Sequence, residues 1–393
     1  MPSVKAAAVA TTSNTPFLGR MSTNVAMALV GLPNVGKSTL FNILTKSQVK
    51  AENFAFCTID PNLAQCLVPD TRFDHLVETF KPASAVPAHL NIYDIAGLVR
   101  GASDGLGLGN AFLSHIRAVD GIYHLVRTFE DVEVMHTDGE VNPVNDLETI
   151  TEELIKKDLE MVKKHVDKLS RLVRSSRDYR EEHEFFTKIQ ELLQEGGQVR
   201  FGNYDAKEVD WLNEFQLLTA KPVIYLVNLS ESDYCRRKNK FLPAIAKWVQ
   251  EHGNEPVIPF SAVYERTLAA LDGEQREAYI KENKAPSALE KIIHMGYKTL
   301  QLQHFFTAGT DEVKCWTVRK GYSYPKGAGV IHSDMENGFI MAEVMKFDDF
   351  KEHGSTEVGV RAAGKLQQQG KTGVISDGDI CFFKFGRPSS KKK

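Results

Sequence analysis

The sequence predicts an α/β fold: a mostly parallel sheet with helices on both faces, an inserted helical segment, and a small β-rich domain near the C-terminal end. Three observations predict it. Short apolar runs alternate with helical stretches between residues 25 and 228, which is typical of parallel β-α-β construction. Apolar residues recur every three or four positions from Leu147 to Val173. Short β-rich runs separated by turn residues follow from about residue 302.

The composition is that of a globular protein. The 393 residues include 48 Lys and Arg against 51 Asp and Glu, so the formal net charge is −3. This balance excludes a protein that coats nucleic acid by bulk charge. No apolar run approaches the ~20 residues that a bilayer span requires, so we expect no membrane partner. The five cysteines form no C-x-x-C pair, which favours a reducing, cytoplasmic location and gives no disulfide framework or zinc site.

The predicted sheet begins with the apolar run Val25–Val30, which leads into a glycine-bearing turn. Ser38–Lys46 then reads as a helix, and Leu90–Tyr93 as a second strand that ends at Asp94. Two further strands are expected at Gly121–Arg127 and Val223–Asn228. Continuous apolar runs of this length indicate strands that are covered on both faces.

A long amphipathic helix interrupts this pattern. One apolar stripe is formed by Leu147, Ile150, Leu154, Leu159, Val162, Val166, Leu169 and Val173. A returning apolar face is formed by Phe185, Phe186, Ile189, Leu192 and Leu193. These two faces predict an antiparallel helical hairpin at residues 145–216, inserted between two parts of one nucleotide-binding domain, 23–144 and 217–300.

The C-terminal part of the sequence has a different residue pattern, with short runs of strand-forming residues. Its β-rich runs are Val313–Val318, Gly338–Met345 and Asp379–Phe385. We expect a separate domain at residues 302–387, followed by a basic tail at 388–393. At the other end, residues 1–22 are expected to be a disordered tail, since they are Ser/Thr-rich and offer little to bury.

The strongest functional signal is GLPNVGKS, which runs from Gly31 to Ser38 and matches G-x-x-x-x-G-K-[ST] between a predicted strand and a predicted helix. Glycines let the backbone fold around phosphates, so that amide groups and the helix N-terminus face the anion. Lys37 would neutralise the β- and γ-phosphate oxygens, and the Ser38 hydroxyl would bind Mg²⁺. The motif therefore predicts a nucleoside triphosphate site.

Two later segments have the features of loops that respond to the bound nucleotide. Asp94 to Gly97 reads DIAG, in which Asp94 would hold Mg²⁺ through a water molecule and the Gly97 amide would sense the γ-phosphate. Thr58 lies between the two motifs and would give a second hydroxyl to Mg²⁺. Segments that are ordered by the γ-phosphate and Mg²⁺, and released on hydrolysis, are the usual basis of nucleotide switches.

The segment after the strand that ends at Asn228 is expected to determine which nucleotide base the protein prefers. Guanine-specific switch proteins have N-K-x-D here, whereas this chain has Asn228-Leu-Ser-Glu231. Leu229 replaces the lysine stem that packs on the base, and Glu231 extends the carboxylate by one methylene, which weakens discrimination for guanine. Asn228 would contact a purine edge, or alternatively only cap a turn. Ser261 and Ala262 would form the second wall of the base pocket.

The chain as a whole resembles the Obg-like ATPases of the YchF subfamily. The resemblance is carried by GLPNVGKST, AENFAFCTIDPN, DIAGLVRGAS, GLGNAFLSHI, YLVNLSE, FFTAG, VKCWTVRKG and IHSDMENGFIMAEV. It implies a translation-factor-class P-loop G-domain with a helical hairpin and a C-terminal TGS domain of the β-grasp type. It also implies ATP in preference to GTP, association with the ribosome, the large subunit and its RNA, and a role in stress. The nucleotide contacts that it implies are Asn34, Val35, Gly36, Lys37, Ser38, Thr39 and Leu229.

The residues for hydrolysis depart from Ras-like enzymes. The position after D-x-x-G is Leu98, which cannot orient water, so slow intrinsic turnover is expected. The resemblance suggests two helpers: K⁺ held near Asn34, and His136 as a catalytic histidine, although a lone loop histidine is usually only solvated. Two other functions stay open, a conventional GTPase in which Glu231 still reads guanine, and a nucleotide-gated binding module with negligible turnover. We expect a monomer.

A basic stretch lies within the predicted hairpin. Residues 156–180 contain nine Lys or Arg and four acidic residues. This pattern is either a solvated helix face or an arm that contacts phosphates and weakens with salt. Tyr322–Lys326 departs from the family pattern and is expected to be a loop that faces a partner.

Overall fold

A computed structural model of the chain describes residues 18–19, 25–48, 62–95, 116–130 and 140–386. The chain folds as two compact units, one containing Glu152–Lys221 and the other containing Met21–Thr151 with Pro222–Lys393. None of the helices in the described ranges is both long and apolar enough to cross a membrane.

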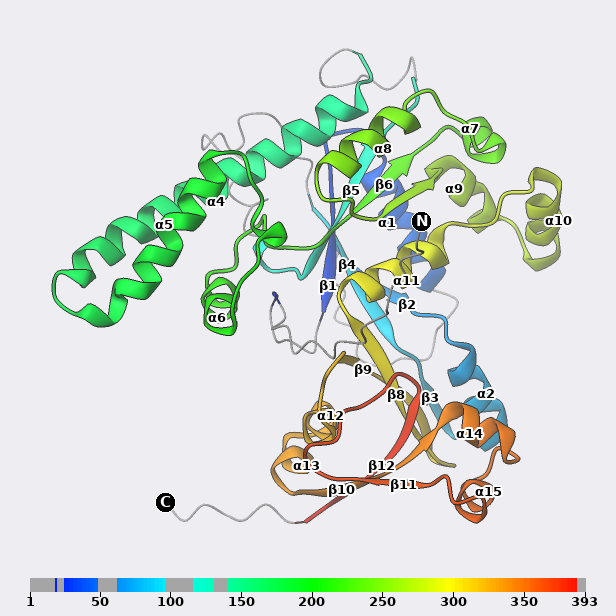
Figure 1. The fold of residues 1–393 in the computed structure, drawn as a ribbon. Coiled ribbons are helices and arrows are strands. Elements are labelled where there is room, and N and C mark those ends of the chain that lie inside the picture. Colours follow the sequence, from blue (N-terminus) through cyan, green and yellow to red (C-terminus); the bar gives the residue numbers. More distant parts are fainter. Residues whose placement is uncertain (1–17, 20–24, 49–61, 96–115, 131–139, 387–393) are drawn as a thin grey trace, which may run out of the picture. The chain divides into compact units, whose positions relative to one another are not determined.

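The larger unit contains the predicted parallel sheet (Figure 1). Its strands are β1 Ala26–Val30, β2 Leu63–Leu67, β4 His89–Asp94, β5 Gly121–Arg127, β6 Val223–Asn228 and β7 Val257–Phe260. They lie in the order β2-β4-β1-β5-β6-β7, and only the β2–β4 pair is antiparallel. Strands β1, β5 and β6 are buried along their whole length, as their continuous apolar runs predict. The α/β fold class is therefore confirmed, and β2 and β7 extend the predicted sheet.

Helices connect and cover these strands. They are α1 Lys37–Gln48, α2 Thr71–Phe80, α7 Glu231–Arg236, α8 Leu242–Glu251, α9 Ala262–Ala270, α10 Gly273–Asn283 and α11 Leu289–Thr299. Helix α11 is attached to the sheet by the buried Tyr123 hydroxyl on β5, which donates to the carbonyl of Ile292 at 2.8 Å. Gly296 is required nearby, because a Cβ there would lie 2.1 Å from the Tyr123 hydroxyl oxygen.

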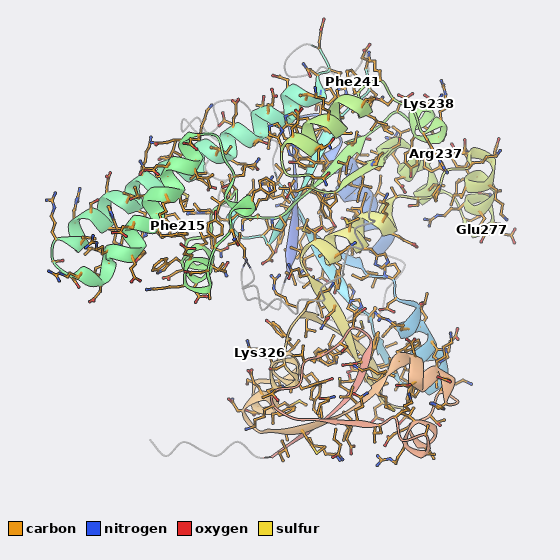
Figure 2. All side chains as sticks on the ribbon, viewed as in Figure 1. Phe215, Arg237, Lys238, Phe241, Glu277 and Lys326 are labelled. Carbon is orange, nitrogen blue, oxygen red and sulfur yellow. The ribbon has the colours of Figure 1, made fainter. Side chains whose placement is uncertain are left out.

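The helical insertion consists of three helices. Helix α4 spans Pro143–Val173, α5 spans Arg180–Gln194 and α6 spans Ala206–Phe215, with short 3-10 turns at Arg177–Tyr179 and Val199–Phe201. The two predicted apolar faces share one core, in which Val162 and Leu169 from α4 join Phe186 from α5. Phe215, labelled in Figure 2 at the end of α6, stacks at a tilt on Phe186 with ring centroids 5.0 Å apart. Helix α6 lies within the predicted range 145–216, but the prediction had two helices there instead of three.

A buried carboxylate on α4 binds the segment that follows α6. Asp158 on α4 has no exposed surface and accepts hydrogen bonds from the Leu218 amide at 2.9 Å and the Thr219 amide at 2.7 Å. The Thr219 hydroxyl donates to the same carboxylate at 2.7 Å. These three donors offset the cost of burying the charge, so the end of the insertion is fixed to its first long helix.

A second sheet forms the C-terminal domain. Its strands are β3 Ser84–Val86, β8 Leu302–Ala308, β9 Glu312–Arg319, β10 Phe339–Lys346, β11 Gln367–Gln369 and β12 Asp379–Phe385. Their order is β11-β10-β12-β8-β9-β3. The β-rich domain is as predicted, but it also contains the helices α12 Tyr324–Ile331, α13 Ser333–Asn337, α14 Phe347–Glu352 and α15 Glu357–Ala362. Strand β3 lies more than two hundred residues before the rest of this sheet and pairs in parallel with β9.

The loop expected at Tyr322–Lys326 is a helix from its third residue onward. Helix α12 begins at Tyr324, whose side chain is 1% exposed and whose hydroxyl donates to the Asp379 carboxylate at 2.9 Å. Proline at the second position of this helix is compatible with its first turn, because backbone amides there have no helical partner. Tyr324 therefore belongs to the core of the C-terminal domain, whereas Lys326 is exposed.

Side chains connect the second sheet to the start of helix α2. His304 on β8 hydrogen-bonds the Asp70 carboxylate at 3.0 Å, and Arg72 forms ion pairs with Asp70 at 2.7 Å and with Asp377 at 3.0 Å. Burial alone would raise the pKa of Asp70, but hydrogen bonds from His304 and Arg72 outweigh it and hold that pKa well below its usual range. The C-terminal domain is thus joined to the residue that caps α2.

Candidate nucleotide-binding site

The predicted site residues gather at one edge of the first sheet. Since β1, β4, β5, β6 and β7 are parallel, their carboxyl ends lie together. The segments that leave this edge begin at Gly31, Asp94, Thr128, Asn228 and Ser261. In open α/β sheets this edge is where ligands bind. The strand order reverses at β1, so the glycine-rich loop leaves the sheet at the switch point.

The loop between β1 and α1 is held by its own lysine. Lys37 is 7% exposed, and its ammonium group donates to the carbonyl of Gly31 at 3.0 Å and to that of Leu32 at 2.7 Å. Burial lowers the pKa of Lys37 to about 8, although the Asp94 carboxylate acts in the opposite direction. The cation that would meet phosphate oxygens is therefore already positioned inside the loop.

Two backbone positions in this loop need unusual conformations. Asn34 has φ 62° and Gly36 has φ 101°, both in the left-handed region. A Cβ at Gly36 would lie 2.4 Å from the side-chain nitrogen of Asn228, so only glycine fits there. Asn34 and Ser38 are exposed, Val35 is buried, and Thr39 is half-buried. The loop therefore presents its polar side chains outward while its backbone packs against β6.

The structure brings together two of the three predicted oxygen donors for a metal, Ser38 and Asp94. The Ser38 hydroxyl, at the start of α1, hydrogen-bonds the carboxylate of Asp94, at the end of β4. Burial raises the pKa of Asp94, and the hydrogen bond to Ser38 and the charge of Lys37 partly offset this rise. Hydroxyl and carboxylate oxygens are the ligand types that Mg²⁺ prefers. The pair therefore fits a magnesium ion, whose positive charge would favour the ionised carboxylate.

Asn228 connects two loops of the site. Its side-chain amide donates to the Val35 carbonyl at 2.9 Å, and its side-chain oxygen accepts from the Ala262 amide at 3.0 Å. The backbone carbonyl of Asn228 accepts from both the amide and the hydroxyl of Thr128. Asn228 is 2% exposed, and these bonds hold the glycine-rich loop and the start of α9 against the end of β6. It does more than cap a turn.

The predicted base-recognition residues lie around the start of α7. Leu229 is buried and donates its amide to the Phe260 carbonyl at 2.8 Å. Glu231 lies in the first turn of α7, and its carboxylate accepts a 2.7 Å hydrogen bond from the hydroxyl of Tyr279 on α10. This bond raises the pKa of Tyr279 to about 12. Ser261 and Ala262, both buried, begin α9 on the opposite side of Asn228.

Sequence reasoning missed Thr128 and Tyr279. Thr128 had a usable signal, because it is a polar residue directly after β5 and so belongs to the same sheet edge. Tyr279 had none, since it lies 48 residues beyond Glu231 on a helix that buries no residue. Three expected site residues, Thr58, Gly97 and His136, lie outside the described residues, as does Leu98.

Comparisons with known proteins agree with this fold. A family described as 50S ribosome-binding GTPase matches residues 26–167. A domain family named YchF-GTPase_C, described as of unknown function, matches residues 302–386. The solved structure of the Schizosaccharomyces pombe YchF GTPase aligns with a TM-score of 0.86 at 45% identity and covers 94% of this chain and 100% of that one.

Full-length relatives are similar as well. The Obg-like ATPase 1 of Oryza sativa subsp. japonica is 57% identical over 380 residues, and that of Homo sapiens is 52% identical over 383 residues. Each alignment covers 96% of both chains. Together with the glycine-rich loop at the switch point, these similarities show that the chain belongs to the Obg-like ATPase family, P-loop nucleotide hydrolases of the YchF type.

Proposed function

We propose that this chain is a cytoplasmic, Mg²⁺-dependent ATPase that cleaves the β–γ phosphoanhydride of ATP in preference to GTP and acts as a nucleotide switch on the ribosome. Relatives named Obg-like ATPase 1 support ATP, whereas the similar yeast protein is described as a GTPase. The argument for base choice therefore rests on the site. The observation that carries it is the Glu231 carboxylate held by Tyr279.

A carboxylate reads guanine with two oxygens, because guanine offers both N1–H and an exocyclic amino group on one edge. Adenine offers only its exocyclic amino group as a donor there. One oxygen of Glu231 already accepts the hydrogen bond from Tyr279, so a base donor to that oxygen would share it, whereas the other oxygen can accept from one amino group unshared. This arrangement supports adenine. Leu229, which has no charged stem to extend over the base, supports the same choice.

The phosphate end is assigned from the contacts of the loop. Lys37 would exchange its bonds to the Gly31 and Leu32 carbonyls for phosphate oxygens, and Ser38 and Asp94 would hold Mg²⁺, Asp94 through water. When bound, the ion would neutralise charge on the phosphate oxygens. Thr58 and Gly97 complete the proposed switch, and Asn34 to Thr39 form the proposed phosphate contacts.

The first experiment is competition of ATP and GTP for one labelled adenosine triphosphate analogue. We expect ATP to compete at least about tenfold better, the effect of one to two well-placed hydrogen bonds. Tighter binding of GTP by tenfold would overturn the adenine assignment. It would also favour the alternative of a conventional GTPase, in which Glu231 reads guanine despite its extra methylene.

A pair of tyrosine variants tests the role of Tyr279. Removing its hydroxyl in Tyr279→Phe should lower the ATP-to-GTP preference about twofold to tenfold, the worth of one hydrogen bond. Tyr234→Phe is the matched control, since Tyr234 lies in the same aromatic cluster but donates to the Pro286 carbonyl. Equal changes in both variants would show that the cluster acts only through packing.

The rate of hydrolysis separates an enzyme from a nucleotide-gated binding module. Leu98 cannot position water, an observation that favours the module unless K⁺ near Asn34 or the proposed catalytic residue His136 assists. Single-turnover phosphate release should therefore be slow and faster with potassium than with sodium. Release no faster than that of a Lys37→Ala variant, with either cation, would favour the module.

The ribosome is the proposed partner, and a role in the stress response would follow from control of translation. The family description of the matching N-terminal region supports the ribosome, as do the exposed lysines Lys163, Lys164 and Lys168 of α4. Neutralising these three should weaken co-sedimentation of the monomer with large ribosomal subunits at low salt and leave ATP binding intact, since phosphate contacts depend on charge. Unchanged sedimentation would exclude this arm as an RNA contact.

A further inference from the structure

The second sheet is open between β8 and β12. These strands pair in parallel only at Phe305 with Asp379 and at Phe306 with Ile380. Strand β12 continues to Phe385 and pairs there with β10 alone. Among the described residues, β12 beyond Ile380 therefore has no strand neighbour on its β8 side. An unpaired strand edge is a template for another extended segment.

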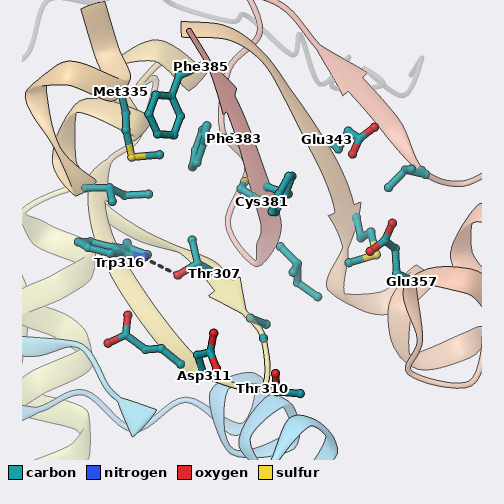
Figure 3. A pocket seen from close by; sticks show the side chains of 18 residues that line it. Thr307, Thr310, Asp311, Trp316, Met335, Glu343, Glu357, Cys381, Phe383 and Phe385 are labelled. Carbon is teal, nitrogen blue, oxygen red and sulfur yellow. Dashed lines mark hydrogen bonds between the residues drawn. The ribbon is translucent and has the colours of Figure 1, made fainter. Parts of the chain in front are cut away.

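A cavity of about 790 Å³ occupies this opening, within the roughly 300–1,000 Å³ of typical ligand sites. It is lined by the end of β8, the β8–β9 turn, β12, β10 and nearby helices (Figure 3). Two lining phenylalanines are unusually accessible, Phe382 at 66% and Phe385 at 50%. Exposed aromatic side chains beside an open strand edge indicate a surface that buries apolar groups of a partner.

The two sides of the opening differ in chemistry. Phe383, Phe385 and Met335 lie on one side of β12 in Figure 3, and Glu343 and Glu357 lie on the other. A strand that fills the opening would send alternate side chains to these two sides, because successive residues of a strand face opposite ways. One set would meet apolar side chains, and the other would meet carboxylates together with Phe382, which the strand register places opposite Glu343.

The charge of the opening has one sign. Its charged lining residues are all acidic: Asp311, Glu312, Glu343 and Glu357. Glu343 and Glu357 also pair with Lys384 at 2.8 Å and Arg361 at 2.7 Å, both outside the lining. Asp311 and Glu312 form no ion pair within the described ranges. A basic peptide is therefore attracted to this opening, whereas a nucleic-acid backbone is repelled.

We propose that the opening between β8 and β12 binds an extended protein segment in which apolar and basic residues alternate, and that this segment adds to the free edge of β12 as a further strand. Main-chain hydrogen bonds to β12 supply affinity, and the two sides of the opening supply specificity. The site lies in the C-terminal domain and uses none of the residues proposed to bind the nucleotide.

The test uses the full chain and a short fluorescent peptide of alternating valine and lysine, followed by fluorescence anisotropy. Two comparison peptides isolate the features of the proposal. One has the same composition in separate valine and lysine blocks, and the other carries N-methyl groups on the edge that would pair with β12. We expect each to bind at least about tenfold more weakly, since the first loses the alternation and the second loses several hydrogen bonds. Equal binding of all three peptides would overturn the proposal.

A charge-reversed variant locates the site. Asp311→Lys with Glu312→Lys, in the exposed β8–β9 turn, should weaken the alternating peptide about tenfold without changing the melting temperature or ATP hydrolysis. Glu277→Lys is the matched control, because Glu277 is exposed on α10, as Figure 2 shows, and lies outside the lining. The Glu277→Lys variant should bind the alternating peptide with the same affinity as the unmodified chain. Equal weakening by the control variant would overturn the assignment of the site.

The basic end of this same chain is a competing occupant. Removing residues 387–393, which include Arg387 and three lysines, should leave peptide affinity unchanged. Binding that appears only after this removal would show that the chain's own end takes the opening, and it would overturn a site for a partner. Displacement of the peptide by single-stranded RNA would overturn it as well.

Discussion

The two sheets of the larger unit hold their polar side chains in different ways. In the first sheet, side chains at the carboxyl edge bond to the backbone of neighbouring loops. Lys37 donates to the carbonyls of Gly31 and Leu32, and Asn228 bonds the Val35 carbonyl and the Ala262 amide. These bonds define the path of the loops that would surround a nucleotide.

In the second sheet, charged side chains bond mainly to one another. The Asp379 carboxylate has no exposed surface, is paired with Lys346 at 2.6 Å and accepts from the Tyr324 hydroxyl. His304 and Arg72 likewise meet Asp70. We therefore expect substitutions at the edge of the first sheet to act mainly on ligand affinity, and those in the second sheet to act on stability.

The largest expected effect is on Lys37. Lys37→Ala should lower single-turnover ATP hydrolysis at least about 10²–10³-fold, because a preorganised charge in the phosphate loop is lost. Its counterpart is Lys346→Ala, which removes the half-buried ion-pair partner of the buried Asp379 and should lower the melting temperature while leaving hydrolysis within about twofold. If both variants lost hydrolysis equally while folded, the distinction between the sheets would fail.

Asn228→Ala should lower both the stability of the protein and its affinity for ATP. It leaves the Val35 carbonyl and the Ala262 amide without their side-chain partner, so we expect about 2–4 kcal/mol less unfolding free energy, together with weaker ATP binding. Gln303→Ala is the control from the second sheet, since Gln303 is 8% exposed and donates to the Ile375 carbonyl. Urea unfolding and nucleotide titration of both variants make the comparison, and unchanged ATP affinity in Asn228→Ala would contradict it.

Asp70 gives the second sheet a dependence on pH. The pKa of Asp70 is lowered in the folded protein, so its ionised form adds stability that is present above about pH 4 and declines as the pH falls further. Asp70→Asn should therefore cost about 2 kcal/mol at pH 7 and less at pH 3. Chemical denaturation at both pH values checks this, and a cost that does not depend on pH would exclude the charge as its cause.

Asp94 should change the stability with pH in the opposite direction to Asp70, and this is the smallest effect that we expect. Its pKa is raised, so its ionisation opposes folding, and the stability it contributes is present below about pH 4 and is lost as the pH rises through the raised value. Asp94→Asn in metal-free buffer should therefore raise the melting temperature slightly at pH 7 while lowering Mg²⁺-dependent hydrolysis. A fall in melting temperature at pH 7 would contradict this interpretation.

The first sheet and the phosphate loop could be predicted because their signals are local. The strands β5 and β6 were expected at their observed bounds, and α1 differs from its predicted range by one residue at its start and two at its end. Placement of Lys37, Ser38 and Asp94 at one edge follows from parallel strands alone. The loop prediction failed at Tyr324–Lys326, where a departure from the family pattern suggested a loop but the buried hydroxyl of Tyr324 anchors a helix.

The phosphate loop, the parallel sheet and the long helix α4 follow from the amino-acid sequence, because each depends on neighbouring residues or on a repeating apolar pattern. Three contacts emerge only in the folded chain: Ser84–Val86 joins the second sheet, Tyr279 hydrogen-bonds Glu231, and His304 hydrogen-bonds Asp70 across 234 residues. These contacts have no periodicity, since a hydrogen bond between distant segments depends on where the folded backbone brings them rather than on their spacing in the chain.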